Sequence, residues 1–381
     1  MKIGLFMDEK NMCYNTLNFF MSKIEEVLRQ NGIQTKLITR IDREVIQQQF
    51  DALIGLNRPE PALQSSDGVF ILDRLGIPFF NIIVDAPYYH SGSTKSHTES
   101  LHLICLDRGH VEYCKKYYMP CKSVEMGYLL GPVGNRIPYV ERTIDILFTG
   151  GRYDYNSIKE DFLSDKYSVE MQDIFLYLID AGINFPEKTT EELVLSYLQY
   201  GENQIESDVL DFIMGQVGVW AEYYLRGYYR EKIIRLLVDA GLHVTVAGGG
   251  WDGIFAECPA NLTLLGEVDM METADLTANA KILLNVMPWF KDGLHDRIPT
   301  AMHNGSVCVT DSSSYIDEHF QDDENIVLYR LDALEKLPDK CKYLLEHPEK
   351  ARDIAEAGQR KAELEYNWEH FTSNYILKWL L

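Results

Sequence analysis

The stretch Gly293–Asp311, reading GLHDRIPTAMHNGSVCVTD, constrains the fold of this chain more than any other. It follows an apolar, strand-like run over Ile282–Met287. It then provides a polar loop, a predicted helix from about His295 to His303, a turn at Asn304–Gly305 and a second apolar strand over Val307–Thr310. A strand, loop, helix and strand in this order are typical of a parallel α/β sheet. Ligands of such sheets bind beyond the carboxyl ends of the strands, where helix N-termini favour phosphate.

Arg297 adds a chemical signal to this stretch. It lies in the first turn of the predicted helix. Its guanidinium group presents a planar fork of donors that pairs with phosphate oxygens in a bidentate way. The stretch therefore predicts a diphosphate-bearing ligand.

The first half of the chain alternates short strand patterns with helical ones. The expected strands are 2–7, 35–39, 50–56 and 79–84. This alternation favours right-handed βαβ units and a Rossmann-like domain. No G-x-G-x-x-G follows the first strand, so we expect no dinucleotide site of the usual kind there.

Two glycine-rich turns follow predicted strands in the second half. Gly150, Gly151 and Arg152 come after a strand over 144–148, and Gly248–Gly250 come after one over 243–247. Glycines at a strand end let a backbone or a ligand approach closely, and an arginine suits an anion. An ordinary turn is the alternative interpretation.

Residues 154–240 carry almost no strand signal and are predicted to form a helical insertion. A capping-box pattern over Thr189–Glu192 marks one of its helix starts. Its aromatic residues favour packing between helices over a recognition surface for a partner.

Acid–base candidates in the first half cluster after the strand that ends at Val84. They are Asp85, His90 and His97. The competing interpretation is that Asp85 caps a turn before Pro87 and that the histidines are exposed loop residues.

Composition narrows the classes of function. A chain of 381 residues that is 46% hydrophobic can bury a core in two or three domains. A net charge of −22 argues against nucleic acid or an anionic membrane as a partner. No run reaches the roughly 20 apolar residues of a membrane span, so a cytoplasmic location is expected. The seven cysteines show no zinc spacing, and reduced, buried thiols are expected.

The order of motifs in the second half resembles the C-terminal domain of GT-B glycosyltransferases, and most of all the CgeB-like branch, also called glycosyl transferases group 1. The resemblance covers most of 144–155 and 240–372. The motifs that carry it are FTGGR (148–152), VAGGGW (246–251), LLGEVD (264–269), ILLNVMPW (282–289), DRIPTAMHNGSVCVTD (296–311) and EHPEKARDIAEAGQRKAELEYNWEHF (346–371).

The resemblance implies an α/β protein of GT-B architecture, with two Rossmann-like domains facing a cleft and the helical insertion in the C-terminal half. It implies an acceptor domain over 1–135, a nucleotide-sugar domain over 144–360 and a closing helix over 361–381 that packs back on the first domain. It also implies donor contacts from residues of the second half. These are Gly150, Gly151, Arg152, Gly248, Gly249, Gly250, Asp292, His295, Arg297 and Thr300.

One departure from the family pattern bears on the reaction. Many retaining members carry two glutamates eight positions apart, where this chain has Asp292 and Thr300. Asp292 can still serve the sugar, whereas Thr300 offers a single hydroxyl. If the enzyme inverts, Asp85 or His90 is the candidate base, and if it retains, the leaving phosphate can take the acceptor proton.

The predicted function is transfer of a sugar from a nucleotide-diphosphate sugar, with a UDP-sugar favoured, to a glycan, protein or small-molecule acceptor. No metal is expected, because no D-x-D signature stands at a strand end. The alternatives are a GT-B-like scaffold without catalysis and a nucleotide-sugar epimerase.

Overall fold

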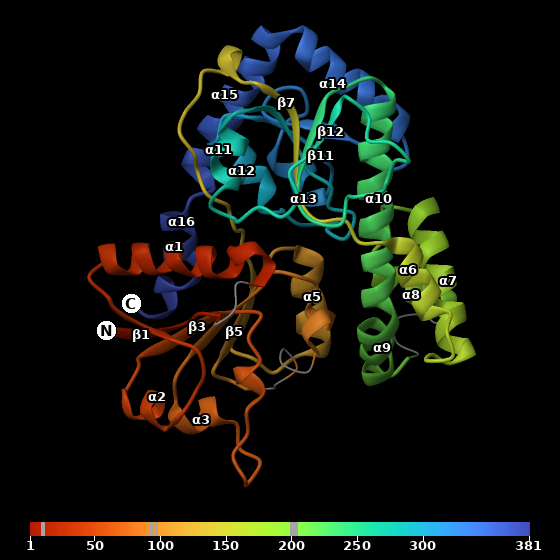
Figure 1. Cartoon of the computed structure of the whole chain (residues 1–381). Coiled ribbons are helices and arrows are strands. Elements are labelled where there is room, and N and C mark those ends of the chain that lie inside the picture. The colour runs from red at the N-terminus through yellow and green to blue at the C-terminus, as the bar shows by residue number, and fades with distance from the viewer. Residues whose placement is uncertain (9–11, 92–94, 96–97, 199–204) are drawn as a thin grey trace. The chain divides into compact units, whose positions relative to one another are not determined.

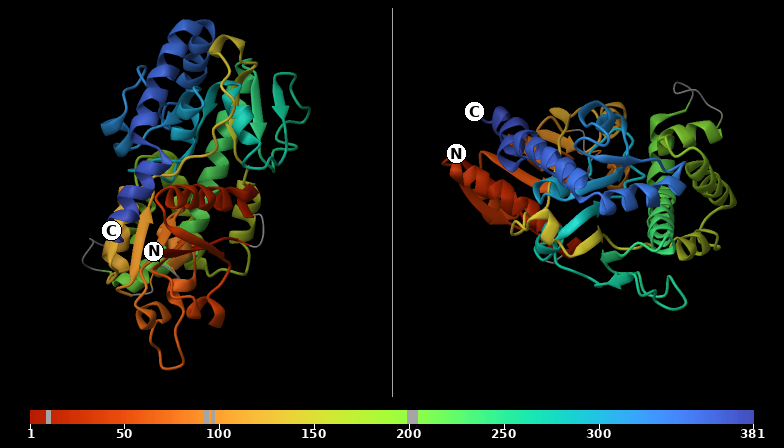
Figure 2. Two further views of the ribbon diagram at one scale, coloured as in Figure 1. Left: turned by 90° about the vertical axis from the view of Figure 1, so that its left-hand side faces the viewer. Right: turned by 90° about the horizontal axis from the view of Figure 1, so that it is seen from above.

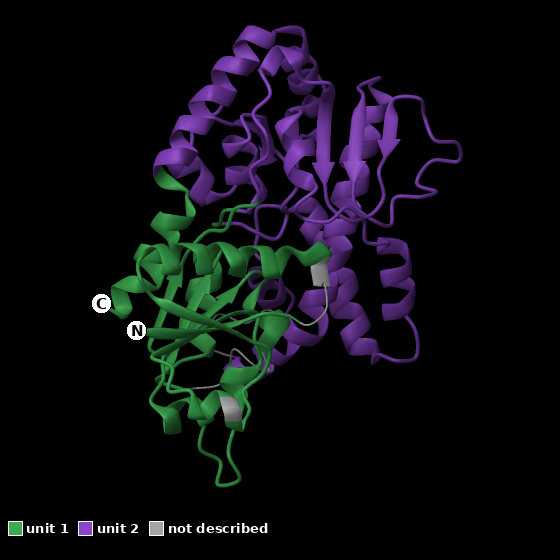
Figure 3. Cartoon of the chain, turned by 60° about the vertical axis from the view of Figure 1, so that its left-hand side comes forward, with its two compact units in different colours: residues 1–131, 292–294, 365–381 green, residues 132–291, 295–364 purple. Residues whose placement is uncertain are grey.

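The structure is a computed structural model that describes residues 1–8, 12–91, 95, 98–198 and 205–381. The chain divides into two compact units, coloured separately in Figure 3. Unit 1 comprises residues 1–131, 292–294 and 365–381, and unit 2 comprises residues 132–291 and 295–364.

Unit 1 is built on a six-stranded parallel sheet with the order β2-β1-β3-β4-β5-β6 (Figure 1). Its strands are mostly buried, in keeping with their apolar sequences. They are β1 (Lys2–Phe6), β2 (Gln34–Ile38), β3 (Ala52–Leu56), β4 (Phe79–Ile83), β5 (Leu101–Cys105) and β6 (Ser123–Met126).

The longest helix of unit 1 shows why the local sequence folds as it does. Helix α1 (Thr16–Gln30) buries an apolar face at helical spacing, including Ile24 and Leu28. It ends where Gly32 adopts a φ of 73°, a conformation that suits glycine. The other helical elements of unit 1 are η1 (Met12–Asn15), α2 (Arg43–Gln47), η2 (Glu60–Ala62), α3 (Ile71–Leu75), η3 (Pro87–His90), α5 (Arg108–Tyr117), α16 (Trp368–Tyr375) and η7 (Leu377–Trp379).

The end of the chain belongs to unit 1. The ring of Trp368, at the start of α16, lies 6.5 Å from that of Phe19 and 5.9 Å from that of Phe20 on α1. Both termini therefore lie at the same unit, and Figure 2 shows them near each other in two views.

Unit 2 carries a second six-stranded parallel sheet, with the order β12-β11-β10-β7-β8-β9. Its helical elements include the cluster α6–α10 between β7 and β8, seen together in Figure 1. The strands are β7 (Ile144–Thr149), β8 (Val244–Ala247), β9 (Leu262–Leu264), β10 (Ala280–Leu284), β11 (Val307–Asp311) and β12 (Val327–Tyr329).

Helix α10 (Val219–Asp239) is buried on several faces, because it packs against the sheet and against the neighbouring helices. A π-helical segment, Met214–Gly218, leads into it. The remaining helical elements of unit 2 are η4 (Tyr139–Glu141), α6 (Tyr155–Phe162), α7 (Val169–Asn184), α8 (Thr190–Leu198), α9 (Ser207–Ile213), α11 (Thr273–Ala278), α12 (Arg297–His303), α13 (Ser314–His319), η6 (Leu334–Lys336), α14 (Leu337–Glu346) and α15 (Pro348–Glu365).

Each sheet reverses its strand order at one place. In unit 1 the reversal lies between β1 and β3, and in unit 2 it lies between β7 and β10. Such a switch point opens a crevice at the carboxyl ends of the two strands and is the usual ligand site of open α/β sheets. The two predicted Rossmann-like sheets and the helices inserted in the second half are thus confirmed.

Candidate functional site

The two glycine turns of unit 2 cross each other at the carboxyl ends of β7 and β8. The amide of Gly150 donates to the carbonyl of Ala247 at 2.7 Å, and the amide of Arg152 donates to that of Gly249 at 2.9 Å. A Cβ atom on Gly248 would lie 2.3 Å from the carbonyl oxygen of Gly150. Gly248 is therefore required by the close approach of the two turns, whatever they bind.

The side chain of Arg152 is paired within the protein. Its Nε donates to Glu231 of α10 at 2.6 Å, and its guanidinium lies 3.6 Å from Asp154. The side chain is 14% exposed. Its charge is thus compensated by carboxylates of the chain.

Arg297 lies at the switch point between β7 and β10. Its Nε donates to Thr149 Oγ1, at the end of β7, at 3.1 Å, and its Nη1 lies 3.2 Å from Nε2 of His295. Burial lowers the pKa of Arg297, because the protein interior solvates the charged guanidinium less well than water does.

His295 orients Arg297. Burial lowers the pKa of His295 to about 4, even though the carboxylate of Asp296 acts in the opposite direction. The imidazole is therefore neutral at neutral pH. Its Nδ1 lies 2.9 Å from Asp296 Oδ1, so a proton on Nδ1 leaves Nε2 to accept from Arg297.

Helix α10 adds two arginines that the sequence analysis missed. Arg226 and Arg230 are both 5% exposed. The guanidinium of Arg226 lies 3.6 Å from the ring centre of Trp289, and Nη1 of Arg230 donates to the carbonyl of Gly151 at 2.8 Å. Their spacing of four residues places them on one face of the helix, which is the sequence signal that could have found them.

The guanidinium groups of Arg226, Arg230 and Arg297, here named the cation cluster, lie close enough to repel one another. Burial, together with the charges of Arg297 and Arg226, lowers the pKa of Arg230 to about 9, although Asp296 acts in the opposite direction. Nε of Arg230 has no hydrogen-bond partner within the described part of the chain. A ligand with two or more negative charges would relieve this repulsion.

Two other residues predicted to contact the donor have partners of their own. Asp292 belongs to unit 1, where its Oδ1 accepts from Nε of Arg108 at 2.9 Å and its amide donates to Asp107 at 2.8 Å. Thr300 is buried within α12, and its hydroxyl donates to the carbonyl of Asp296 at 2.5 Å.

Asp85 and His90 lie together after β4 in unit 1. Asp85 Oδ2 lies 3.8 Å from Nε2 of His90 and accepts from the side-chain amide of Asn57 at 3.3 Å. The third predicted member, His97, falls outside the described residues.

Neither a metal site nor a membrane span is found in the parts of the chain that the structure covers. No three or more histidine, cysteine, aspartate or glutamate side chains gather there as metal ligands. No helix there combines the length and the apolar character needed to cross a membrane.

Comparison with known proteins places these features in context. Residues 230–376 match the family model described as glycosyl transferase-like. None of the curated proteins compared with the chain matches it.

Solved structures of glycosyltransferases share the fold over the whole chain. Anabaena HepE, in complex with UDP and glucose, has a TM-score of 0.52 at 10% identity and covers 100% of this chain and 99% of its own. AviGT4, of avilamycin A biosynthesis, has a TM-score of 0.51 at 10% identity, with 100% and 97% covered. The β-glucosyltransferase of T4 phage, with UDP-glucose, has a TM-score of 0.51 at 13% identity, with 99% and 100% covered.

Proposed function

We propose that this chain, a glycosyltransferase of the GT-B fold, takes a UDP-sugar as its donor and receives the diphosphate on the cation cluster. The observation that carries the proposal is the gathering of three neighbouring guanidinium groups, those of Arg226, Arg230 and Arg297, at the switch point of unit 2. The CgeB-like subtype stays a prediction.

Similar structures support the choice of donor. Anabaena HepE and the T4 phage enzyme have both been solved with UDP-glucose. A glycosyl donor of this kind leaves as a nucleoside diphosphate, so its charge must be neutralised as the bond to the sugar breaks. A buried group of arginines provides this neutralisation in advance of the reaction.

The proposed reaction needs no metal ion. Three guanidinium groups supply fixed donors to the phosphate oxygens, and His295 holds Arg297 in place through its neutral Nε2. The crossing turns at Gly150–Arg152 and Gly248–Gly250 are proposed to border the donor.

The acceptor proton has two proposed destinations, one for each stereochemical outcome. With inversion, Asp85 is the proposed base, with His90 beside it. With retention, the leaving phosphate takes the proton, and Asp292 is proposed to serve the sugar. Product stereochemistry decides between them.

The acceptor class and the compartment are also proposals. The net charge of −22 favours a glycan, a protein or a small molecule over nucleic acid, and a cytoplasmic location. The T4 phage enzyme is described as DNA-modifying, so a DNA acceptor is the natural comparison in an assay.

The first test is a thermal-shift titration with UDP, GDP, dTDP and CMP on the wild type, Arg297→Gln and the exposed control Arg330→Gln. We expect selective stabilisation by UDP that Arg297→Gln loses and Arg330→Gln keeps, because binding to the native state raises stability by mass action. No stabilisation by any nucleotide overturns the proposed donor site.

Product analysis then tests the reaction itself. We expect UDP to be released from the matching UDP-sugar in the presence of an acceptor, with EDTA leaving the rate unchanged. A scaffold would bind UDP without turnover, and an epimerase would change the sugar without releasing UDP.

A further inference from the structure

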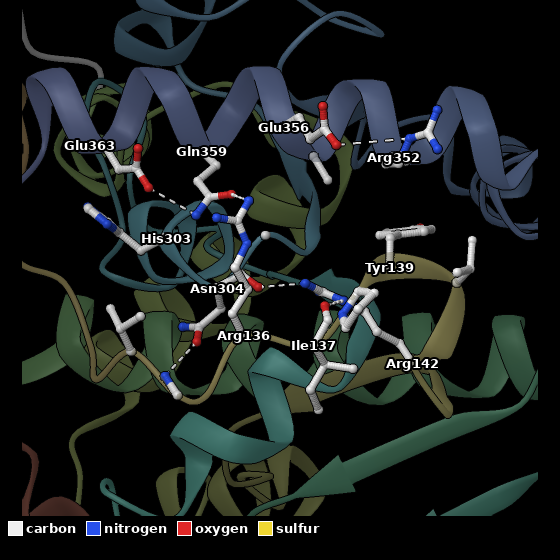
Figure 4. Close-up of a pocket in the computed structure, with 16 residues that line it drawn as sticks. Arg136, Ile137, Tyr139, Arg142, His303, Asn304, Arg352, Glu356, Gln359 and Glu363 are labelled. Carbon is white, nitrogen blue, oxygen red and sulfur yellow. Dashed lines mark hydrogen bonds and ion pairs between the residues drawn. The ribbon is translucent and has the colours of Figure 1, made fainter.

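A cavity lies at the amino ends of the strands of the unit 2 sheet. It has a volume of about 440 Å³. Its walls are the segment 133–142, residues 303–305 and one face of α15, as the close-up in Figure 4 shows. Arg142 precedes β7 and Gly305 precedes β11, so the cavity borders the amino ends of these strands. The cation cluster lies at their carboxyl ends, and the cavity is therefore a different site.

The floor of the cavity holds a buried charge without an ionic partner. Arg142 is 5% exposed. Its guanidinium donates to four neutral oxygens, the carbonyls of Ile137, Ala280 and Asn304 and the hydroxyl of Ser306, at 2.8–3.2 Å. It makes no ion pair with a carboxylate of the described residues. Burial, with a smaller contribution from the nearby Arg136, lowers the pKa of Arg142 to about 10.

Arg136 brings a second cation to the opening of the cavity. Its Nη2 donates to Oε1 of Gln359 on α15 over a long distance, 3.4 Å. Figure 4 shows Arg136 between Gln359 and the loop at Asn304. Like Arg142, it forms no ion pair with an acid of the described residues. The positive charges of the two arginines therefore add up at the cavity.

The glutamates of α15 that line the cavity interact with other side chains of the same helix. Glu356 lies 3.9 Å from both Arg352 and Arg360, and Glu363 accepts from the amide of Gln359 at 3.0 Å. The cavity wall thus keeps a positive side, formed by Arg136 and Arg142, in a protein whose net charge is −22.

The remaining wall is largely apolar. It is made of Val133, Ile137, Pro138, Val140, Ala355 and the ring of Tyr139. The volume falls within the range of small-molecule sites, about 300–1,000 Å³, and a few polar groups within an apolar lining are their usual composition. A fully hydrated inorganic ion would leave this apolar surface unused.

We propose that this cavity binds a small organic anion, with its carboxylate or phosphate group at Arg136 and Arg142 and its apolar or aromatic body against Tyr139 and Ile137. The site is separate from the donor site, and the inference does not depend on the proposed function. Arginine is suited to both anionic groups, because its fork of donors matches their oxygens.

The test uses calorimetric titration of the full chain with phenyl phosphate and with benzoate. Inorganic phosphate and phenol supply the charge alone and the ring alone. The variants are Arg136→Glu and Arg136→Lys, with Arg330→Gln as a matched control, because the side chain of Arg330 is 75% exposed and neither it nor its partner Asp332 lines the cavity. Arg297→Gln tests whether the anion binds at the cation cluster instead.

We expect one of the two aromatic anions to bind, and the one that binds more tightly identifies the anionic group. Arg136→Glu should weaken its binding at least about tenfold, since a charged hydrogen bond is lost and a repulsion gained. Arg136→Lys should restore part of the affinity, and Arg330→Gln and Arg297→Gln should leave it unchanged.

Three results would overturn the inference. The first is binding of neither aromatic anion by the wild type. The second is binding that Arg297→Gln abolishes and Arg136→Glu does not, which would place the anion at the cation cluster. The third is inorganic phosphate binding as tightly as phenyl phosphate while benzoate does not bind, which would leave no role for the apolar wall.

Discussion

The two sheets have the same kind of switch point but opposite charge balance. In unit 1, Arg58 follows β3 and pairs with Asp8, after β1, at 2.8 Å and with Glu60 at 2.5 Å. In unit 2, Asp296 acts on both Arg230 and Arg297 of the cation cluster, and these two arginines repel each other. Burial disfavours the charge of Arg58, but its two acids outweigh this and raise its pKa. The strand order thus produces a crevice in both units, and the balance of charged side chains decides which of the two crevices attracts an anion.

The largest effect is expected where the pairing is broken in unit 1. Arg58→Met leaves Glu60, which is 6% exposed, and Asp8 without their cation. Removing one partner of a buried pair is strongly destabilising, and we expect a loss of about 3 kcal/mol in the free energy of unfolding. Urea denaturation measures this, and UDP binding should not change. The exposed pair of Arg74 with Asp67 is the control, and Arg74→Met should cost under about 0.5 kcal/mol.

The corresponding change in unit 2 should act on binding instead of stability. Arg230→Met removes a cation that its neighbours repel, so we expect stability to change by less than about 1 kcal/mol. UDP affinity should fall about thirtyfold, because a charged hydrogen bond to phosphate is lost. Calorimetry of UDP binding and urea denaturation measure the two effects. A stability loss as large as that of Arg58→Met, with UDP affinity intact, would contradict the difference between the units.

A neighbouring strand end in unit 2 offers a test by pH. Burial raises the pKa of Asp311, at the end of β11, from its ordinary value of 3.8 to about 6. The native state therefore keeps a proton that the unfolded chain releases between these values, and stability falls as the pH rises through this window.

Asp311→Asn removes this dependence and keeps an acceptor for the amide of Met287. Above pH 6 we expect the variant to be more stable than the wild type by about 1–2 kcal/mol, with the difference fading toward pH 4. Denaturation curves at several pH values measure it. A constant difference at all pH values would show that Asp311 does not titrate in this way.

The smallest effect concerns Arg152. It is adjacent to the glycine turn, but its guanidinium is paired with Glu231, as Arg58 is paired with its acids. Arg152→Gln should therefore change UDP affinity by less than about threefold, as measured by calorimetry. A loss equal to that of Arg230→Met would mean that Arg152 leaves Glu231 to bind the diphosphate.

The fold could be predicted from local sequence because strands and helix caps depend on short patterns of residues. The capping box at Thr189 is formed, with the amide of Glu192 donating to Thr189 Oγ1 at 3.1 Å and the amide of Thr189 donating back to Glu192 at 2.7 Å. A cap of the same kind begins α16, where the side chain of Asn367 accepts from the amide of His370.

The candidate site was predictable only where its residues follow a strand. Arg297 was found because it lies just after β10 in sequence, whereas Arg226 and Arg230 belong to a helix whose aromatic residues had suggested packing alone. Whether an arginine is paired depends on tertiary contacts, as the 79 positions between Arg152 and Glu231 illustrate. Short sequence patterns carry no information on such pairing.

The division of the chain into units has a consequence for evolution by recombination. The chain passes from one unit to the other after residues 131, 291, 294 and 364, so neither unit is a continuous segment of the gene. Exchanging residues 1–131 alone with those of a relative would set a foreign α1 against the native Trp368, whose ring packs against Phe19 and Phe20. A viable chimera must inherit the last 17 residues, 365–381, together with the first unit.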